Sequence, residues 1–476
     1  MSITQVLSRA LPKHLVIHGD EMTRPFECDG LSMYRQKPLA VVLAENIEQI
    51  KQVILLCKKH HTPIVTRGAG TGLAGGALPL ENSIVLGLSK LNQVKSIDPI
   101  AQTAIVEPGV RNIAISEAVS QYGLYYAPDP SSQIACTIGG NVAENSGGVH
   151  CLKYGLTVHN VVAIKMLTID GEELILNRDD DGLGLLALMN GSEGLLGVIT
   201  EVTVKLTPKP QLARLVMAGF DQVRDCANAI SNIIEAGIIP AGLEMMDKFA
   251  ISAAEDFAKA GYPREVQALL LCELDGGEDE VQQELDIVLK LLSSASTLTV
   301  SNNEQERLSL WQGRKSAFPA VGRLSPDYYC MDGTIPRRYL ADVLEKINQL
   351  SQHYQLRVAN VFHAGDGNLH PLILYDANVE GEIEKTEAFG TEILKLCVDV
   401  GGSITGEHGV GIEKLNAMCH QFTPAEIDIF HQIKAVFDQE ALLNPGKAIP
   451  TLHRCAELGS MHVHNGELPH PELERF

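Results

Sequence analysis

The 476-residue chain lacks any closely spaced pair of cysteines. Its 10 cysteines are scattered along the chain, and no two of them are separated by only two residues. This absence excludes zinc ribbons, thioredoxin-like redox pairs and ferredoxin-like cluster motifs, because all of these need such spacing. We therefore expect free thiols in a reducing cytoplasm.

Long apolar runs and an excess of positive charge are absent as well. The chain has no run of roughly 18 or more apolar residues that could span a bilayer, and its N-terminus lacks the apolar core of a signal peptide. Lys and Arg total 38 against 59 Asp and Glu, which gives a formal net charge of −21. Such an acidic surface repels phosphate backbones, so nucleic acid is excluded as a partner. An anionic substrate would have to meet a local basic site.

What the chain does contain is typical of a globular protein with a sizeable core. Hydrophobic residues make up 45% and charged residues 20%, and the length suggests about three domains. Short strand-like and helix-like segments alternate up to Pro208-Lys209-Pro210, which predicts a domain boundary. Beyond it, longer strands and helices alternate. This pattern predicts an α+β layer with the sheet on one side and the helices on the other.

Three glycine-dense segments, at 67–76, 127–148 and 191–197, stand out in the first part of the chain. The first contains a G-x-G-x-x-G match, but Pro79 and an apolar run follow it where a Rossmann site needs a helix. We therefore reject a Rossmann fold. The loop can still act as a nest whose backbone N–H groups converge on a phosphate. Together, the three segments indicate a long ligand that the backbone approaches closely.

A histidine pair flanks a predicted hairpin in the last third of the chain. Strand-like segments lie on both sides of Asp366-Gly367, a signal for a two-residue turn. In that register His363 lies directly opposite His370. Directly opposed side chains are close enough for two imidazoles to share one metal ion. The alternative is a pair of hydrogen-bonded, partly buried histidines without a metal.

A second segment, 401–409, places Glu407 and His408 in a loop between glycines. Two histidines and a carboxylate that leave coordination positions open suit a catalytic divalent metal. Imidazole and carboxylate ligands admit Zn, Mn, Fe or Co. The sequence therefore predicts a metal site formed by His363, His370 and Glu407.

Five short strings carry a resemblance to a known family: 63–72 (PIVTRGAGTG), 128–132 (PDPSS), 137–141 (TIGGN), 191–194 (GSEG) and 443–447 (LNPGK). They resemble the FAD-linked oxidases of the vanillyl-alcohol-oxidase (PCMH) type. The whole chain is similar to the FAD-binding catalytic subunits of bacterial glycolate oxidases, with D-lactate and D-2-hydroxyglutarate dehydrogenases as near relatives.

The resemblance implies an α+β fold with two domains. A FAD-binding domain would span 1–209, with its core from about 38, and a substrate-binding cap with the metal site would span 210–422. A C-terminal segment, 423–476, would return to the flavin domain and carry a tail. The tail contains His453, Cys455, His462, His464 and His470. We favour docking of the tail onto the body or a partner subunit over a second metal site.

The resemblance also implies which residues bind FAD. The first loop has no histidine between Arg67 and Gly76 that could tether the flavin, so FAD is expected to bind non-covalently. The implied cofactor residues are Arg67, Gly68, Ala69, Gly70, Thr71 and Gly72 at the pyrophosphate; Pro130, Ser131, Thr137, Gly139, Gly140, Asn145 and Gly147 along the flavin and ribityl chain; Gly194 and Ile199 on the adenine side; and Asn444 near the ring.

The implied reaction is the oxidation of a short 2-hydroxy acid, glycolate and also D-lactate, to glyoxylate or pyruvate. His408 would be the base, and the metal would lie on His363, His370 and Glu407. Arg314 would grip the substrate carboxylate with its planar fork. Lys315 and Arg323 are weaker candidates for the same role. Relatives that take dicarboxylates place a lysine near the position of Tyr328, and its absence here favours a small substrate.

Because the chain has no cluster-binding cysteine pattern, its electrons must pass to another molecule. The resemblance implies an iron–sulfur subunit and a second flavin-type subunit, with a quinone as another acceptor, and attachment to the inner membrane surface only through partner subunits. Three alternatives stay open. They are a D-lactate or D-2-hydroxyglutarate dehydrogenase that acts alone, a metal-dependent hydrolase with purely structural glycine loops, and a flavin-holding scaffold subunit without chemistry of its own.

Overall fold

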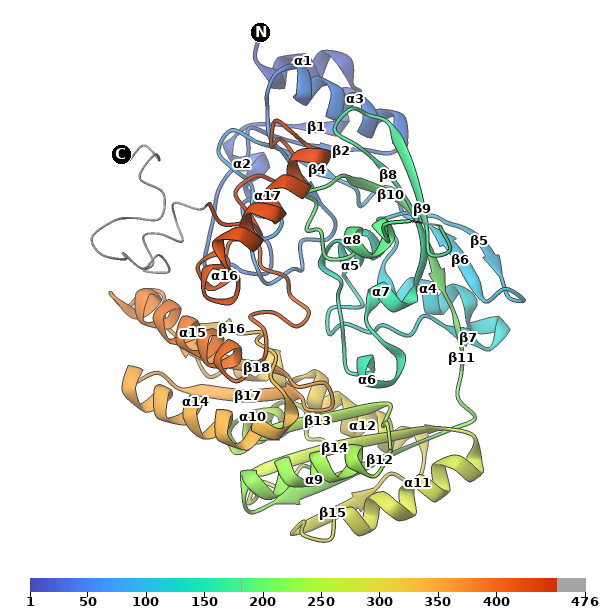
Figure 1. Ribbon diagram of the computed structural model, residues 1–476, viewed down its shortest axis with the longest axis vertical. Helices are drawn as coiled ribbons and strands as arrows, with labels where there is room; N and C mark the ends of the chain where they lie inside the picture. The colour runs from blue at the N-terminus through green and yellow to red at the C-terminus, as the bar shows by residue number, and fades with distance from the viewer. Residues whose placement is uncertain (181, 452–476) are drawn as a thin grey trace.

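The computed structural model describes residues 1–180 and 182–451. Figure 1 shows the N-terminal region (residues 1–209, blue to green), with two smaller sheets, above a region built on one seven-stranded sheet (residues 212–399, green to orange). None of the described helices combines the length and the hydropathy of a bilayer-spanning segment. The five His and Cys residues of the predicted tail lie outside the described residues, so its docking stays a prediction, as do the domain boundaries at 209 and 422.

The first small sheet presents the first glycine loop. Its strand order is β1 (Val16–Ile17), β2 (Ala40–Leu43), β4 (Ile84–Gly87), β3 (Ile64–Arg67), and β2 and β3 both run parallel to β4. The crossover between β2 and β3 is α3 (Ile47–Lys59), which buries Ile50, Val53, Ile54 and Cys57. That spacing is the apolar stripe of an amphipathic helix. The glycine loop leaves the sheet at the carboxyl end of β3, where parallel sheets bind ligands.

The second small sheet is antiparallel, with the order β5 (Val94–Asp98), β6 (Thr103–Val106), β10 (Val198–Lys205), β8 (Val161–Leu167), β9 (Glu173–Asn177). A two-stranded ribbon pairs β7 (Leu124–Tyr125) with β11 (Thr207–Pro208). The other helices of this region are α1 (Ile3–Ala10), α2 (Asp20–Thr23), α4 (Asn112–Val119), α5 (Ile138–Glu144), α6 (Cys151–Tyr154), α7 (Thr157–Asn160) and α8 (Leu185–Met189).

Helix α5 forms inside the second glycine-dense segment, which the sequence presents only as a loop. Its apolar side chains Ile138 and Val142, one helical turn apart, are fully buried. The helix ends at Asn145, whose left-handed backbone (φ 53°) is a common way to stop a helix. Burial of one side of the segment thus outweighs the low helix propensity of Gly139 and Gly140.

The third sheet is antiparallel throughout and supplies the other half of the site. Its order is β15 (Thr297–Val300), β12 (Leu212–Phe220), β14 (Ala268–Gly276), β13 (Gly242–Asp247), β17 (Val358–His363), β18 (Asn368–Tyr375), β16 (Asp327–Cys330). Its helices are α9 (Val223–Glu235), α10 (Lys248–Ala258), α11 (Glu278–Leu291), α12 (Glu304–Lys315), α13 (Ala317–Val321), α14 (Leu340–Tyr354) and α15 (Glu382–Asp399).

Helices cover both faces of this sheet, so the expectation of helices on one side only is wrong. Leu270, Cys272 and Leu274 of β14 pack with α9, α11, α14 and α15, whereas the alternating residues Leu269 and Leu271 pack with α10, α12 and α13. Successive side chains of a strand point to opposite faces. Because both sets on β14 are apolar and fully buried, each face requires its own cover of helices.

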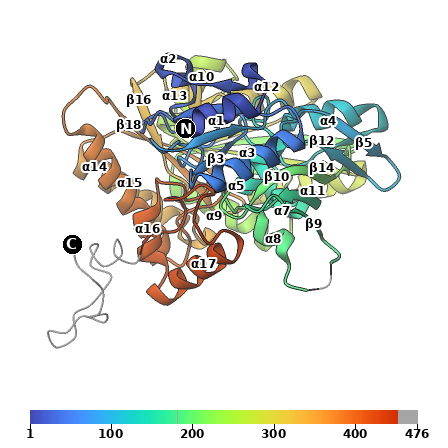
Figure 2. The ribbon, with the colours of Figure 1, turned by 90° about the horizontal axis from the view of Figure 1, so that it is seen from above.

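The chain returns to the N-terminal region after the seven-stranded sheet. Helices α16 (Leu415–Gln421) and α17 (Pro424–Phe437) follow, and Figures 1 and 2 both place α17, in red, beside that region. The Lys434 ammonium of α17 donates to the carbonyl of Leu195 at 2.6 Å. The Ile64 N–H of β3 donates to the Leu442 carbonyl at 2.7 Å. The segment after α17 therefore lies along β3.

Candidate active site

A cavity of about 440 Å³ lies where the N-terminal region meets the seven-stranded region. Residues of all three glycine-dense segments line it, and so do Lys315, Phe318, His370, Glu407 and His408. Segments that are far apart in the sequence, and for which the sequence predicted different ligands, therefore share one space. A long cofactor and a small substrate could meet there.

Most of the predicted cofactor residues line this cavity. They are Gly68, Ala69, Gly70, Thr71, Gly72, Pro130, Ser131, Thr137, Gly139, Gly140, Gly194 and Ile199. A side chain at Gly68 would place a Cβ 2.3 Å from the Thr137 hydroxyl oxygen, so only glycine fits there. That hydroxyl is buried, and no described residue bonds to it. A glycine-rich loop beside the unpaired hydroxyl of Thr137 fits the polar chain of a dinucleotide cofactor.

The other four predicted cofactor residues support the wall of the cavity without lining it. The Asn444 amide donates to the carbonyls of Gly76 (2.9 Å) and Glu193 (2.7 Å), and so ties the chain after α17 to two glycine-dense segments. The Arg67 guanidinium donates to the Cys28 carbonyl at 2.7 Å. A direct contact between these two side chains and a cofactor stays a prediction.

Gly147 and Asn145 also have structural partners. A Cβ on Gly147 would lie 2.5 Å from Glu407 Oε2, so the N-terminal region packs its backbone against this carboxylate. The Asn145 side chain accepts the backbone N–H of Val158 at 2.9 Å. Gly147 thus helps to position a predicted metal ligand.

The predicted histidine pair exists, but its register differs from the expected one. His363 pairs with Asn368, and His370 pairs with Val361. The turn therefore spans residues 364–367 and is not the two-residue turn that Asp366-Gly367 predicted. A shift of two residues keeps both histidines on the same face, because side-chain direction alternates with a period of two. The two rings are diagonal neighbours with centroids 5.0 Å apart.

The pair faces Glu407, as the sequence predicted. Glu407 Oε1 lies 2.9 Å from His370 Nε2 and 3.3 Å from His363 Nε2. Burial opposes ionisation of Glu407, but the charge of His363 and hydrogen bonds from both imidazoles hold its pKa well below the usual range. One ligand atom from each of the three residues lies within 4.8 Å of the others. A single cation could bind all three.

The outer ring nitrogens fit a metal site too. His363 Nδ1 lies 2.8 Å from Glu244 Oε1, and His370 Nδ1 donates to the Met331 carbonyl at 3.1 Å. Such partners fix the tautomer and direct the other nitrogen, Nε2, toward the metal in known sites. The residues present therefore suit a divalent cation bound by two imidazoles and one carboxylate.

Asp332 organises the loop that carries Glu407 and His408. It is fully buried and accepts backbone N–H groups from Gly406 (3.1 Å), Glu407 (3.1 Å) and His408 (2.9 Å). It also accepts the Thr405 hydroxyl at 2.6 Å. Sequence reasoning missed Asp332, whose only local signal is an Asp-Gly pair after a strand.

Two further groups stabilise the negative charge of this aspartate. The buried ammonium of Lys414 lies 3.3 Å from Asp332 Oδ2, and the Asn368 amide donates to Oδ1 at 2.9 Å. Burial alone would raise the pKa of Asp332, but the charge of His408, which is protonated in the acidic range where Asp332 titrates, and the charge of Lys414 lower it below the ordinary range. Asp332 therefore stays ionised and holds the loop in one conformation.

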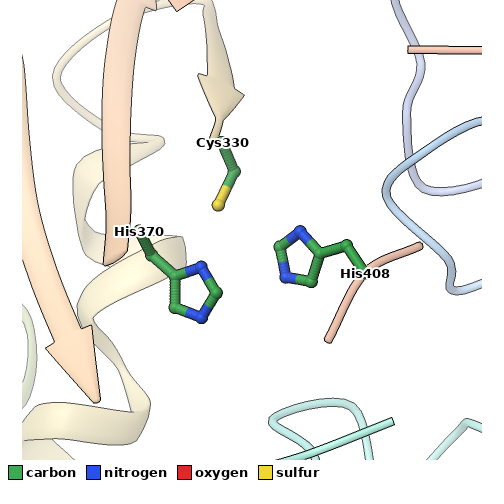
Figure 3. A group of neighbouring side chains, drawn as sticks. All are labelled: Cys330, His370 and His408. Atoms are coloured by element: carbon green, nitrogen blue, oxygen red, sulfur yellow. The ribbon is translucent and has the colours of Figure 1, made fainter. Parts of the chain in front are cut away.

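His408 lies flat against His370, with ring centroids 4.8 Å apart and planes at 8°. Burial lowers the pKa of His408 to about 4, so its imidazole is neutral at neutral pH and can accept a proton. Figure 3 shows the Cys330 sulfur beside the two rings. Burial raises the pKa of this thiol well above its ordinary value. Since metals bind the thiolate, Glu407 suits the metal better than Cys330 does.

The three candidate anchors for a substrate carboxylate have different surroundings. Arg314 is buried, does not line the cavity, and pairs with Glu244 (Nη2–Oε2 2.6 Å). Lys315 lines the cavity, with its Nζ 3.7 Å from an oxygen of Asp129. Arg323 lies away from the cavity, and its guanidinium is 4.3 Å from the Phe257 ring centroid. Among these three, only Lys315 reaches the cavity.

Arg314 supports the predicted metal ligands indirectly. Its guanidinium holds one oxygen of Glu244, and the other oxygen of Glu244 contacts His363 Nδ1. The chain of contacts therefore runs from Arg314 through Glu244 to His363. Helix α12 directs Arg314 toward the sheet and leaves its neighbour Lys315 to face the cavity.

The imidazole of His150 links the N-terminal region to the seven-stranded region beside the cavity. His150 Nδ1 lies 2.9 Å from Asp129 Oδ2, and Nε2 lies 3.2 Å from Glu273 Oε1 of β14. Burial alone would lower the pKa of His150, but the charge of Asp129 and bonds to both carboxylates raise it to about 10. His150 is therefore a cation at neutral pH. The Arg307 guanidinium also donates to Glu273, at 2.7 Å.

Comparison with known proteins assigns each region to a protein family. Residues 38–177 match the family described as FAD binding domain, and residues 209–448 match the family described as FAD linked oxidases, C-terminal domain. The chain is 59% identical to glycolate oxidase subunit GlcD of Escherichia coli (strain K12) over 482 residues, covering 100% of this chain and 96% of that protein. It is 31% identical to D-lactate dehydrogenase of Anaerostipes hadrus over 453 residues, covering 92% and 94%.

The solved structure of p-cresol methylhydroxylase with substrate bound resembles this one with a TM-score of 0.79. The match covers 95% of this chain and 97% of that one at 17% sequence identity, so it bears on the fold alone. It confirms the predicted α+β fold of the PCMH type. The FAD-binding match confirms the expected cofactor class.

Proposed function

Because the chain belongs to the FAD-linked oxidase family, together with the glycolate oxidase subunits GlcD, we propose that it oxidises glycolate, and also D-lactate, to the 2-oxo acid. The observation that carries this proposal is the shared cavity. Its walls combine the glycine loops of the FAD-binding region with His370, Glu407 and His408.

Bound FAD supplies the acceptor for the hydride that leaves the substrate carbon, and the protein supplies placement and proton transfer. The loop at 68–72 carries only the small side chains of Ala69 and Thr71 between its glycines, so its backbone can approach a pyrophosphate closely. It has no histidine that could tether a flavin. FAD is therefore proposed to bind non-covalently.

His363, His370 and Glu407 are proposed to hold a divalent metal (Zn, Mn, Fe or Co). The converging Nε2 atoms and the backing of His363 by Glu244 support this assignment. When bound, such a cation would polarise the substrate hydroxyl as a Lewis acid. His408, neutral and stacked on His370, would take the hydroxyl proton.

Lys315 is proposed as the anchor of the substrate carboxylate, because its side chain lines the cavity. Arg314 is proposed to position His363 through Glu244, which differs from the direct grip expected from the sequence. Arg323 is proposed to have no part in substrate binding, because it lies against Phe257.

An aromatic wall supports a short substrate. Phe318 lines the cavity and meets the His370 ring edge-on, with centroids 6.2 Å apart. Tyr328 also meets Phe318 edge-on, with ring centroids 6.4 Å apart. These rings make the wall beside the proposed metal site apolar, which disfavours the second carboxylate of a dicarboxylate.

The electrons are proposed to leave through another molecule. The glycolate oxidase relative is named as a subunit, and the chain lacks the cysteine spacing of iron–sulfur clusters. An iron–sulfur subunit and a second flavin-type subunit, or a quinone, would accept the electrons. Any contact with the inner membrane surface is proposed to run through such partners.

Stopped-flow spectroscopy of the purified protein tests the function. The protein should show flavin bands near about 370 and 450 nm, and glycolate and D-lactate should bleach them. D-2-hydroxyglutarate should bleach them more slowly. A colourless protein would point to the hydrolase, and a coloured protein that no hydroxy acid bleaches would point to the scaffold. Fast bleaching by D-2-hydroxyglutarate alone would contradict the proposed substrate.

A further inference from the structure

A carboxyl group without a partner faces the cofactor cavity. Glu144 is the last residue of α5, which also carries the cavity-lining Gly139 and Gly140. Glu144 lines the cavity itself. Its Oε2 is buried, and among residues 1–180 and 182–451 nothing hydrogen-bonds to it. A buried polar atom without a partner is destabilising, so a ligand atom is expected to meet it.

The neighbouring carboxyl group, on Glu193, already has its partners. Its Oε1 accepts the backbone N–H of Val410 and its Oε2 accepts that of Gly411, both at 2.7 Å. Two backbone donors favour the ionised form of a carboxyl group. Burial raises the pKa of Glu193, but these two donors oppose the rise, so Glu193 ionises more readily than Glu144.

Glu144 and Glu193 lie against the same glycine. A Cβ on Gly409 would be 2.3 Å from Glu144 Oε2 and 3.0 Å from Glu193 Oε1. Two close carboxyl groups cannot both ionise cheaply. Burial and the charge of Glu193 raise the pKa of Glu144 well above its ordinary value.

The surrounding charges do not offset this effect. Lys414 bonds to Asp332 and Glu413, and Lys447 bonds to Asn444. The other nearby acid, Asp29, accepts the backbone N–H groups of residues 31 and 77. Lys414 and Lys447 oppose the rise in the pKa of Glu144, but each bonds to another group, so the protonated, donating form of Glu144 is favoured.

The position of Gly409 shows which end of the cavity Glu144 faces. Gly409 directly follows His408, the proposed base, which must lie near the reacting carbon of the substrate. That carbon must in turn lie near the flavin ring. We propose that Glu144 donates a hydrogen bond from its protonated carboxyl group to a ring nitrogen or carbonyl oxygen of the FAD flavin. This inference rests on FAD binding and on the proposed place of His408, and not on the identity of the substrate.

Such a contact would favour the reduced flavin. Reduction adds negative charge to the ring, and a neutral donor stabilises that charge better than a carboxylate does. Loss of the donor should therefore weaken the binding of reduced FAD more than that of oxidised FAD. Each tenfold change in this ratio corresponds to about 30 mV for a two-electron couple.

Two variants distinguish the loss of the hydrogen-bond donor from a change in side-chain volume. Glu144→Gln keeps a neutral donor of similar shape, and Glu144→Leu removes it. The exposed Glu117→Leu on α4 is the matched control. FAD affinity, the visible spectrum and the two-electron potential are measured without substrate, so a wrong substrate assignment cannot affect the result. We expect Glu144→Gln and Glu117→Leu to stay within about twofold of the parent, and Glu144→Leu to bind reduced FAD at least tenfold more weakly with a shifted spectrum.

An unchanged affinity, spectrum and potential in Glu144→Leu would overturn the proposal, and so would an altered affinity with an unshifted spectrum. A pH titration of the flavin bands covers the case in which Glu144→Leu does not fold. The parent should show a pH-dependent transition of the flavin bands as Glu144 loses its proton, and Glu144→Gln should lack that transition. Retention of that transition in Glu144→Gln would also overturn the assignment.

Discussion

The carboxylate of Asp332 accepts the backbone N–H of His408 at 2.9 Å, although the two residues are far apart in the sequence. The same carboxylate accepts the N–H groups of Gly406 and Glu407. A single buried side chain thus fixes the direction of the proposed base and of a proposed metal ligand. The geometry of this loop depends on a residue that does not line the cavity.

Replacing Asp332 with Asn should therefore disturb the site as well as the stability. The amide cannot accept all of these donors, and the buried Lys414 loses a counter-charge, so we expect a loss of about 3–5 kcal/mol in the free energy of unfolding. Metal content and flavin reduction by glycolate should fall in the fraction that remains folded. The exposed Asp179→Asn is the control for chemical denaturation and metal analysis. Full metal content in folded Asp332→Asn would contradict this role.

Removing one imidazole of the proposed metal site should empty it. We expect His363→Ala and His370→Ala to lose nearly all of the bound divalent metal in elemental analysis while FAD stays bound, because the glycine loops are separate from the hairpin. The exposed His353→Ala on α14 should keep its metal. Chelation of the parent should reproduce the loss of activity. Full metal occupancy in His363→Ala would refute the site.

His408→Asn should keep both metal and FAD but lose the base. The rate of flavin reduction by glycolate should fall by about 10²–10⁴-fold, which is typical for the loss of a general base. Stopped-flow absorbance measures this rate directly. Bleaching at the parent rate would exclude His408 as the base.

Lys315→Met tests the carboxylate anchor against Arg323→Met. Loss of a charged hydrogen bond to the substrate should raise KM for glycolate roughly tenfold or more. The effect on kcat should be smaller if Lys315 binds the substrate and the transition state equally strongly. Arg323→Met should leave both constants near those of the parent, since Arg323 lies on Phe257 away from the cavity. Steady-state kinetics decide between the two. Equal KM values for Lys315→Met and the parent would show that another residue binds the substrate carboxylate.

His150→Gln should destabilise the protein in a pH-dependent way. The folded state raises the pKa of His150 from 6.5 to about 10, so the stabilisation from its charge is fully present below pH 6.5. It should decline between pH 6.5 and 10 and vanish above. Urea unfolding of parent and variant across this range measures the difference, with His353→Gln as a control. If the difference in the free energy of unfolding between parent and variant grew with rising pH, His150 would not stabilise the protein through its positive charge.

Much of the local structure follows from sequence pattern alone. Helix α3 begins after the cap Asn46, and its buried side chains recur with helical spacing. The Asp170-Gly171 pair, a local turn signal, lies between β8 and β9, which pair as antiparallel neighbours. The two histidines share a face because alternation has a period of two, which holds even though their register was predicted wrongly. Their ligand set with Glu407 was therefore predictable without the true pairing.

The sequence by itself thus determined the family, the glycine loops and the residue types of the metal site, because short-range spacing and motif chemistry encode these features. Tertiary structure decided which cation reaches the cavity, since the packing of α12 turns Arg314 onto Glu244 and leaves Lys315 free to face inward. It also decided that both faces of the large sheet are covered. The roles of Asp332, His150 and Glu144 depend on partners remote in the chain, and no local pattern records such contacts.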